Sequence, residues 1–190
     1  KDSATITITN KALDYIERKK DKPFFCYVAY HMPHVPLAAS PRFKGKSQNG
    51  LYGDVIMELD WAVGEILKKV EALGLSENTI IAFSSDNGPW LSEGPNGGCA
   101  LPLYRGKGQR VPMIVKWKGH IKPAQVEKDV AAMVDWFPTF AHLTGGNVPT
   151  DRPMDGCNIA PVLLGTGARN NEDFVYIAFS KIEAFRSGDW

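Results

Sequence analysis

Apolar residues recur along this chain with two different periods, and the periods alternate from segment to segment. From Tyr52 to about Leu73 the apolar positions lie three or four residues apart, which predicts a long amphipathic helix that stops at Gly74. Three shorter apolar runs, Phe24–Tyr30, Thr79–Phe83 and 111–115, have the length and residue types of buried strands. This alternation predicts an α/β fold, with parallel strands joined by crossover connections.

Two further helices are predicted from capping residues. Asn10 can cap a short helix in which Asp14 faces Arg18, and Asp135 can cap a helix that Gly145 and Gly146 close. Both helices fall before residue 147 and extend the α/β pattern.

The amino-acid composition of the chain changes after residue 146. Residues 147–171 are rich in Pro, Gly and Asn, and the segments Phe174–Phe179 and Ala184–Trp190 read as two short strands that pair antiparallel. We therefore expect an α/β domain over residues 1–146 and the start of a small antiparallel C-terminal subdomain over residues 147–190.

Composition and charge exclude several classes of function. With 22 Lys and Arg against 21 Asp and Glu, the net charge of +1 gives no electrostatic basis for binding nucleic acid or an anionic membrane surface. No apolar run reaches the roughly 18 residues that span a bilayer, and the N-terminus lacks a signal-peptide pattern. The three cysteines are widely spaced and predict neither a zinc site nor a disulfide framework.

Polar side chains follow two of the predicted strands. Asp86 and Asn87 come after Phe83, and His31 and His34 come after Tyr30. If these strands are parallel, all four side chains lie at the carboxyl edge of one sheet, where α/β folds bind ligands. Asp and Asn offer oxygen ligands for calcium or magnesium, although Asn-Gly is also a common turn; each histidine is either a proton donor or a loop residue bonded to the backbone.

A basic, glycine-rich segment supplies candidate anion ligands. In Tyr104-Arg105-Gly106-Lys107-Gly108, two cations stand beside glycines that let a ligand approach the backbone. The segment lacks the P-loop pattern, and a solvated basic turn is the alternative. Together with the carboxylate, amide and imidazoles, it predicts one half of a metal-assisted hydrolytic site for an anionic ester.

Five motifs occur in the order seen in type I sulfatases. They are His31–Leu37, Leu51–Asp54 with Asp60, Phe83–Pro89, Arg105–Gly108 and Arg110–Met113, and the closing segment Ala184–Trp190 is similar to a strand of that family's C-terminal subdomain. The chain resembles the C-terminal half of these enzymes throughout, and is most similar to carbohydrate sulfatases of the N-acetylgalactosamine-6-sulfatase and arylsulfatase type.

The resemblance implies an alkaline-phosphatase-like fold and hydrolysis of a sulfate ester on a sulfated sugar or an aryl sulfate. It implies one Ca²⁺ ion, with Asp86 and Asn87 as two of its ligands, and a formylglycine nucleophile. It also implies that Lys107 binds the sulfate, that His34 contacts the sulfate or protonates the leaving alcohol, and that His31 and Arg105 contact the substrate. A periplasmic, lysosomal or secreted location follows from the family alone.

The chain departs from the family pattern in two places. The nucleophile motif, Cys or Ser followed by x-Pro-Ser-Arg, is absent, as is the family's upstream pair of calcium-binding aspartates. We therefore expect both on the N-terminal half of the same protein and expect this segment alone to be inactive. A short Thr-Thr-aromatic-Glu-Gly-Gly run is also missing after Gly108, through either a shorter loop or residues lacking from this sequence.

Two other functions remain open at this stage. A phosphatase or phosphodiesterase of the same superfamily would need a second metal and more Asp and His ligands than this chain offers. A non-catalytic carbohydrate-binding remnant would keep the fold without an active site. Retention of both the acidic and basic site residues favours the sulfatase.

Overall fold

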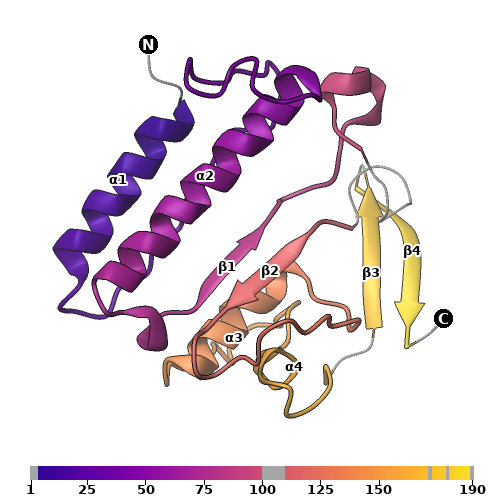
Figure 1. Ribbon diagram of the computed structural model, residues 1–190. Helices are drawn as coiled ribbons and strands as arrows, with labels where there is room; N and C mark the ends of the chain where they lie inside the picture. The colour runs from indigo at the N-terminus through magenta and orange to yellow at the C-terminus, as the bar shows by residue number, and fades with distance from the viewer. Residues whose placement is uncertain (1–3, 100–109, 171–172, 179, 189–190) are drawn as a thin grey trace. The chain divides into compact units, whose positions relative to one another are not determined.

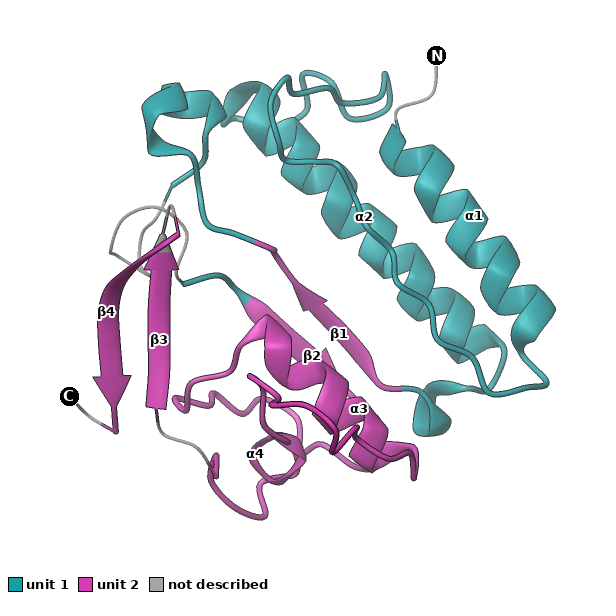
Figure 2. Ribbon diagram, turned by 180° about the vertical axis from the view of Figure 1, so that it is seen from behind, with its two compact units in different colours: residues 1–79, 87–112 teal, residues 80–86, 113–190 magenta. Residues whose placement is uncertain are grey.

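The structure is a computed structural model that describes residues 4–99, 110–170, 173–178 and 180–188. The described residues divide into two compact units, residues 1–79 with 87–112 and residues 80–86 with 113–190, coloured separately in Figure 2. The predicted boundary near residue 147 stays a prediction. The elements, labelled in Figure 1, are α1 (Ala4–Lys19), α2 (Gly50–Ala72), η1 (Ser76–Asn78), β1 (Ile81–Ser84), η2 (Leu91–Asn96), β2 (Met113–Lys116), η3 (Met133–Asp135), α3 (Trp136–Leu143), α4 (Ala160–Leu164), β3 (Asp173–Ala178) and β4 (Lys181–Ser187).

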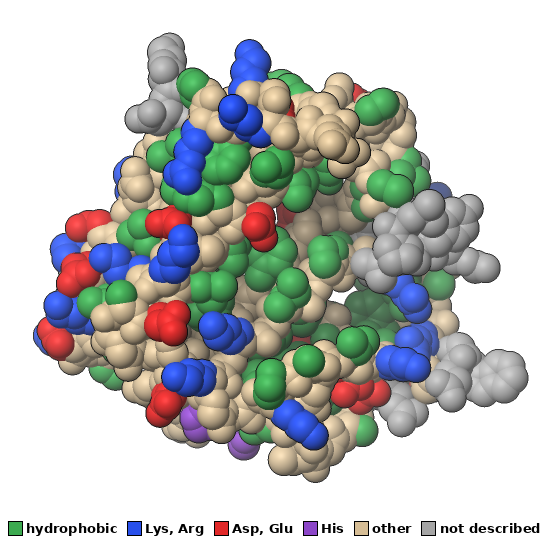
Figure 3. Space-filling model, viewed as in Figure 1, with side chains coloured by type: hydrophobic (Ala, Val, Ile, Leu, Met, Phe, Trp, Pro, Cys, Tyr) green, Lys and Arg blue, Asp and Glu red, His purple; other side chains and the backbone are tan. Residues whose placement is uncertain are grey.

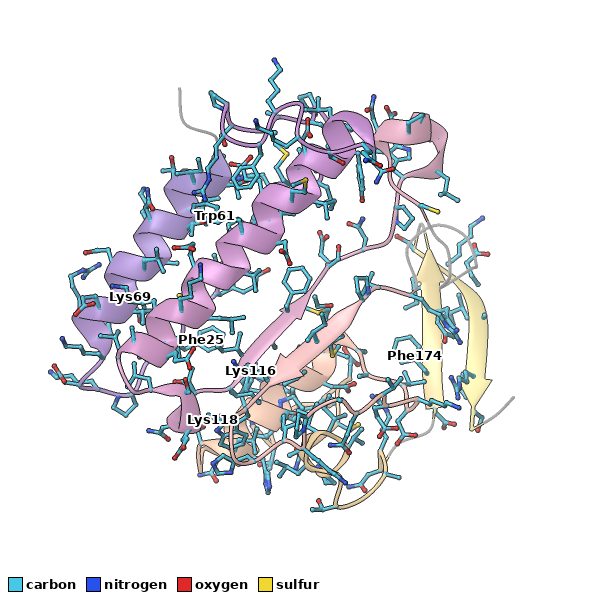
Figure 4. All side chains as sticks on the ribbon, in the orientation of Figure 1. Phe25, Trp61, Lys69, Lys116, Lys118 and Phe174 are labelled. Atoms are coloured by element: carbon cyan, nitrogen blue, oxygen red, sulfur yellow. The ribbon has the colours of Figure 1, made fainter. Side chains whose placement is uncertain are left out.

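Helices α1 and α2 lie side by side and form the core of the first unit (Figure 1). The predicted long helix is confirmed as α2, and Gly74 follows it with a φ of 70°, which favours glycine. Val55, Leu59 and Ala62 are buried on one face of α2, as the periodicity predicted. Near the other end of α2, Lys69 (labelled in Figure 4) makes a 3.0 Å ion pair with Glu17 of α1.

Helix α1 begins at Ala4, so Asn10 lies inside the helix and the capping prediction was wrong. Thr5 and Thr9 are buried on the same face as Ala12 and Ile16. The Thr9 hydroxyl donates a 2.7 Å hydrogen bond to the Thr5 carbonyl, which satisfies a polar group in the core. The first turns of α1 are rich in β-branched residues, which have low helix propensity. Burial of Thr5 and Thr9 stabilises the helix there. The Asp14–Arg18 pair is confirmed at 2.8 Å.

The segment 24–30 is extended but is not a strand of either sheet, so this strand prediction is wrong for the described structure. It packs along α1: the Phe24 and Tyr15 rings meet edge to face at 6.1 Å, and the Tyr30 hydroxyl lies 3.0 Å from the Thr9 hydroxyl. Alternate side chains point outward, with Phe25 70% and Tyr27 75% exposed. Within the described residues no strand lies beside this segment to cover them.

Strands β1 and β2 confirm the other two strand predictions, with ends shifted by one or two residues. They pair antiparallel, with Phe83 opposite Ile114, so the predicted parallel arrangement is wrong for this pair. Between these two strands, the described residues 85–99 contain the short helix η2. The predicted C-terminal strands are confirmed as the antiparallel pair β3–β4, in which Phe174 (labelled in Figure 4) opposes Arg186.

The second unit is held together by contacts around α3 and α4. The Trp136 and Phe140 rings stack at 5.0 Å, and Ile159 is fully buried. The Thr139 hydroxyl donates a 2.6 Å hydrogen bond to the Asp135 carbonyl and accepts a 2.9 Å bond from the Ile159 N–H. Asp135 precedes α3 as predicted, but its carboxylate makes no cap hydrogen bond to that helix.

Two buried carboxylates of α2 organise the loop that precedes it. Asp54 accepts backbone N–H bonds from Ser47 (2.7 Å), Gly45 (2.7 Å) and Lys46 (3.0 Å). One turn further along, Glu58 accepts a 2.9 Å bond from the Ser40 N–H. These bonds fix residues 40–47 against α2, directly after the loop that carries His34.

Acidification should expose the contribution of Asp54. The Ser47 N–H first, then those of Gly45 and Lys46, lower the pKa of Asp54 below its ordinary 3.8, against the opposing effect of burial. A lowered folded-state pKa stabilises the fold above pH 3.8, and this stability is lost as the pH falls through the folded-state pKa. We expect Asp54→Asn to lower the melting temperature at pH 7 and to flatten its fall as the pH drops below about 4. Asp60→Asn, on the exposed face of the same helix, is the control; an Asp54→Asn profile parallel to wild type would contradict this role.

Charged side chains are mixed over the surface. Figure 3 shows Lys and Arg interspersed with Asp and Glu on the face it presents, in keeping with the net charge of +1. Among the described helices, none combines the length and apolar character that crossing a membrane requires.

Candidate active site

His34 lies in an exposed loop, residues 31–37, that contains two cis prolines, Pro33 and Pro36. Its backbone N–H donates a 3.1 Å bond to the His31 carbonyl, which closes a turn. The Nδ1 atom of its ring is 2.6 Å from the Val35 carbonyl oxygen. Because a carbonyl oxygen only accepts, Nδ1 carries the hydrogen, and Nε2 is left as the nitrogen that can gain or lose a proton.

A second loop, residues 90–97, contacts His34 through the side chain of Trp90. The two rings are 6.1 Å apart and tilted by 59°. The Trp90 N–H donates a 3.0 Å bond to the Gly97 carbonyl, so residues 90–97 close on themselves around η2. A Cβ atom on Gly97 would lie 1.9 Å from the Trp90 carbonyl oxygen, so only glycine permits this closure.

The closed loop is anchored to the start of α2. Gly98 has a φ of 85°, and a Cβ atom there would come within 2.6 Å of the Tyr52 hydroxyl oxygen. Burial, with a smaller effect of the neighbouring Cys99, raises the pKa of Tyr52 above its ordinary value of 10.0. The backbone of residues 90–98 is therefore held against Tyr52 on one side and beside His34 on the other.

A cleft of about 450 Å³ lies between these two loops and the first turn of α2. Its volume is within the range of small-molecule sites. All of its walls belong to the first unit, and they combine four apolar residues with a carboxylate and an amide: Val35, Pro36, Leu37, Leu51, Glu93 and Asn96.

Asp86 and Asn87 follow β1 directly, as predicted, and both are exposed. The Asn87 Nδ2 donates a 2.9 Å bond to the Gly88 carbonyl, so its amide nitrogen is turned toward the backbone and the oxygen, the atom suited to a cation, is at the other end. Asp86 belongs to the second compact unit, whereas His31, His34 and Asn87 belong to the first. The predicted convergence of these four residues stays a prediction.

The donor set of Asp86 and Asn87 fits part of a calcium site. A carboxylate and an amide oxygen are hard ligands, and Ca²⁺ takes six to eight of them. Over the described ranges there is no group of three or more His, Cys, Asp or Glu residues that could hold a metal ion. If Asp86 and Asn87 bind Ca²⁺, further oxygen ligands have to come from other parts of the protein.

The two predicted anion ligands, Arg105 and Lys107, lie outside the described residues, and their roles remain predictions. His31 is exposed in the same loop as His34, and its substrate contact also stays a prediction. Sequence reasoning missed Trp90, Glu93 and Asn96. The only available signal was the glycine pair Gly97-Gly98, which marks a close backbone approach.

The sulfatase family model matches residues 2–146. The chain belongs to the sulfatase family. This sulfatase segment is 38% identical to rat (Rattus norvegicus) steryl-sulfatase over 90% of its own length, and 36% identical to the N-acetylgalactosamine-6-O-sulfatase of Bacteroides thetaiotaomicron over 96%. It covers 32% and 39% of those two proteins.

Solved sulfatase structures confirm the fold. A structure from a study of glycosaminoglycan metabolism by Bacteroides thetaiotaomicron superimposes with a TM-score of 0.80 at 36% identity, covering 90% of this chain and 38% of the other. A Pseudoalteromonas sp. sulfatase superimposes with a TM-score of 0.89 at 28% identity, covering 95% and 38%. The predicted alkaline-phosphatase-like α/β fold, present here in part, is thereby confirmed. The chain spans about two fifths or less of the length of these sulfatases.

Proposed function

We propose that the full-length protein containing this chain hydrolyses sulfate esters, with a sulfated carbohydrate as its substrate. The observation that carries the proposal is the family match over residues 2–146, which includes His34, Asp86, Asn87, Arg105 and Lys107. Relatives named as N-acetylgalactosamine-6-sulfatases support the choice of a sugar, and relatives named as steryl-sulfatases make a sterol the competing substrate.

His34 is suited to the proton-transfer step at the leaving oxygen. With Nδ1–H directed to the Val35 carbonyl, Nε2 is the atom that holds the transferable proton. When the S–O bond breaks, negative charge develops on the bridging oxygen, and a proton from Nε2 stabilises the departing alcohol. The exposed position of the ring leaves Nε2 open to a substrate.

Asp86 and Asn87 are proposed to bind Ca²⁺ through their side-chain oxygens, and Lys107 to bind the sulfate as a cation. Calcium would polarise the sulfate oxygens and formylglycine, supplied by an upstream segment, would provide the nucleophile. Arg105 and His31 are proposed to orient the substrate beside them. We expect the mature protein to reside in a periplasmic, lysosomal or extracellular compartment, as family membership implies.

A comparison of two ester classes tests the proposal. The full-length protein is expected to hydrolyse 4-nitrophenyl sulfate and to leave 4-nitrophenyl phosphate intact, and a chelator should abolish the turnover until calcium is restored. Peptide mapping should find a Cys/Ser-x-Pro-Ser-Arg peptide with the mass loss of conversion to formylglycine. The isolated segment 1–190 should show no turnover.

Other outcomes would identify the rival functions. Faster hydrolysis of the phosphate ester would identify a phosphatase or phosphodiesterase. Calcium binding by the full-length protein without turnover of either ester would identify a non-catalytic carbohydrate-binding remnant.

A further inference from the structure

The cleft beside His34 has two chemically different surfaces. Its apolar surface comes from Val35, Pro36, Leu37 and Leu51, and Leu51 remains 37% exposed although it is a large aliphatic side chain. Its polar surface comes from Glu93 and Asn96, both exposed and both on η2.

We propose that this cleft binds an uncharged sugar ring of the substrate, the ring next to the sulfated unit. The inference rests on the proposed function and deepens it by assigning part of the substrate to named residues. A pyranose presents C–H groups on its faces and hydroxyls around its edge. Apolar residues match the faces. The Glu93 carboxylate can accept hydrogen bonds from the hydroxyls, and the Asn96 amide can both accept and donate them.

The charge of the cleft argues against a sulfated or carboxylated occupant. Among its six lining residues Glu93 is the charged one, and a carboxylate repels a sulfate or a uronic acid group. The sulfate itself is therefore expected elsewhere, on the cations of residues 105–107. A sterol is also disfavoured, since its hydrocarbon rings would desolvate Glu93 and Asn96 without bonding to them.

The position of the cleft beside His34 indicates which sugar ring of the substrate would bind in it. Val35, which lines the cleft, directly follows His34 and holds its Nδ1 at 2.6 Å. Trp90, which faces the His34 ring, opens the loop that carries Glu93 and Asn96. The bond cleaved is the S–O bond of the sulfated sugar, and a cleft that begins at Val35, next to His34, is within reach of the ring linked to that sugar.

The walls of the cleft are fixed by backbone contacts. The bond from Trp90 N–H to the Gly97 carbonyl and the close approach of Gly98 to Tyr52 hold η2 in place. Because these contacts do not involve the Glu93 and Asn96 side chains, replacing either side chain should change the lining of the cleft and keep its shape.

The test compares three substrates in the full-length protein: a monosulfated disaccharide, the matching sulfated monosaccharide and 4-nitrophenyl sulfate. We expect Asn96→Ala to lower kcat/KM for the disaccharide, relative to 4-nitrophenyl sulfate, by about three- to tenfold, because one neutral hydrogen bond is lost. The loss should appear in KM, and the monosaccharide should show little of it. Ser92→Ala, exposed on the same short helix but outside the cleft, is the matched control.

Glu93→Gln tests the charge argument. It should keep or moderately weaken use of the neutral disaccharide, and it should relieve discrimination against a disaccharide with a second sulfate on the neighbouring ring. Equal losses on all three substrates, or an Asn96→Ala enzyme as selective as wild type, would overturn the proposal. So would a preference for steryl sulfate that survives both substitutions.

Failure of the proposed function would look different. If the unaltered protein cleaves no sulfate ester, calorimetric titration with the unsulfated disaccharide still tests the cleft, since binding weakened by Asn96→Ala and unchanged by Ser92→Ala needs no turnover. Absence of such binding would refute the cleft assignment, whatever the result for sulfate-ester hydrolysis.

Discussion

Replacing His34 with Ala in the full-length protein should lower kcat for a sulfated sugar by about 10²- to 10⁴-fold, the usual contribution of a general acid. The reason is the fixed orientation of the ring: Nδ1–H is held by the Val35 carbonyl, which leaves Nε2 as the proton carrier. A sugar alcohol is a poor leaving group and depends on that proton. The effect on 4-nitrophenyl sulfate should therefore be smaller, because nitrophenolate departs without protonation.

Two control variants separate this role from others. His142→Ala, on the exposed face of α3, should have wild-type kinetics. His31→Ala should raise KM more than it lowers kcat if His31 only contacts the substrate. A His34→Ala enzyme with equal losses on the sugar and the nitrophenyl ester would assign His34 to sulfate binding; unchanged kcat on both would remove it from the site. The melting temperature checks folding, and little change is expected for an exposed ring.

The sequence predicted those helices and strands that show a clear hydrophobic pattern within a short stretch of residues. Helix α2 was predicted because Val55, Leu59 and Ala62 repeat with helical spacing, and β1 and β2 because their apolar runs are short and bounded by turns. Asp54 and Glu58 of the same helix are also buried, and N–H groups of the preceding loop donate hydrogen bonds to their carboxylates. Burial of a polar side chain depends on partners that no helical period reports.

The direction and neighbours of strands could not be predicted in the same way. The run 24–30 has the composition of a buried strand, but a strand needs partners, and the described residues provide none beside it. The antiparallel pairing of β1 with β2 is likewise not encoded in the composition of either apolar run.

The sequence predicted which residues belong to the candidate site, but it did not predict the cleft beside them. His34, Asp86 and Asn87 were proposed from short motifs and their resemblance to a known family, and their roles stay predictions. The cleft depends instead on contacts between distant loops, such as Trp90 with His34 and Gly98 with Tyr52. The cleft is therefore the feature that only the structure could reveal.

The buried ion pair between Arg169 and Asp135 in the second unit could not be predicted from any short stretch of the sequence. Arg169 and Asp135 are 34 residues apart in sequence, and their side chains are 5% and 0% exposed. The guanidinium also donates a 3.1 Å bond to the Val130 carbonyl. The Asp135 carboxylate additionally accepts backbone bonds from Ala132 (2.7 Å) and Cys157 (2.9 Å). One carboxylate thus joins three chain segments to the start of α3.

Arg169→Leu should therefore lower the free energy of unfolding of this unit by about 3–5 kcal/mol, because it leaves a buried carboxylate without its counter-ion. The measurement is urea denaturation of the full-length protein, followed by a probe in the second unit. Arg152→Leu is the matched control: Arg152 also makes two hydrogen bonds to an aspartate, Asp151, but both side chains are 67% exposed, and solvent screening should leave no measurable change. The double variant Arg169→Leu with Asp135→Asn should recover part of the loss, since the uncompensated charge is gone. Equal, small effects of Arg169→Leu and Arg152→Leu would show that the buried pair does not hold this unit together.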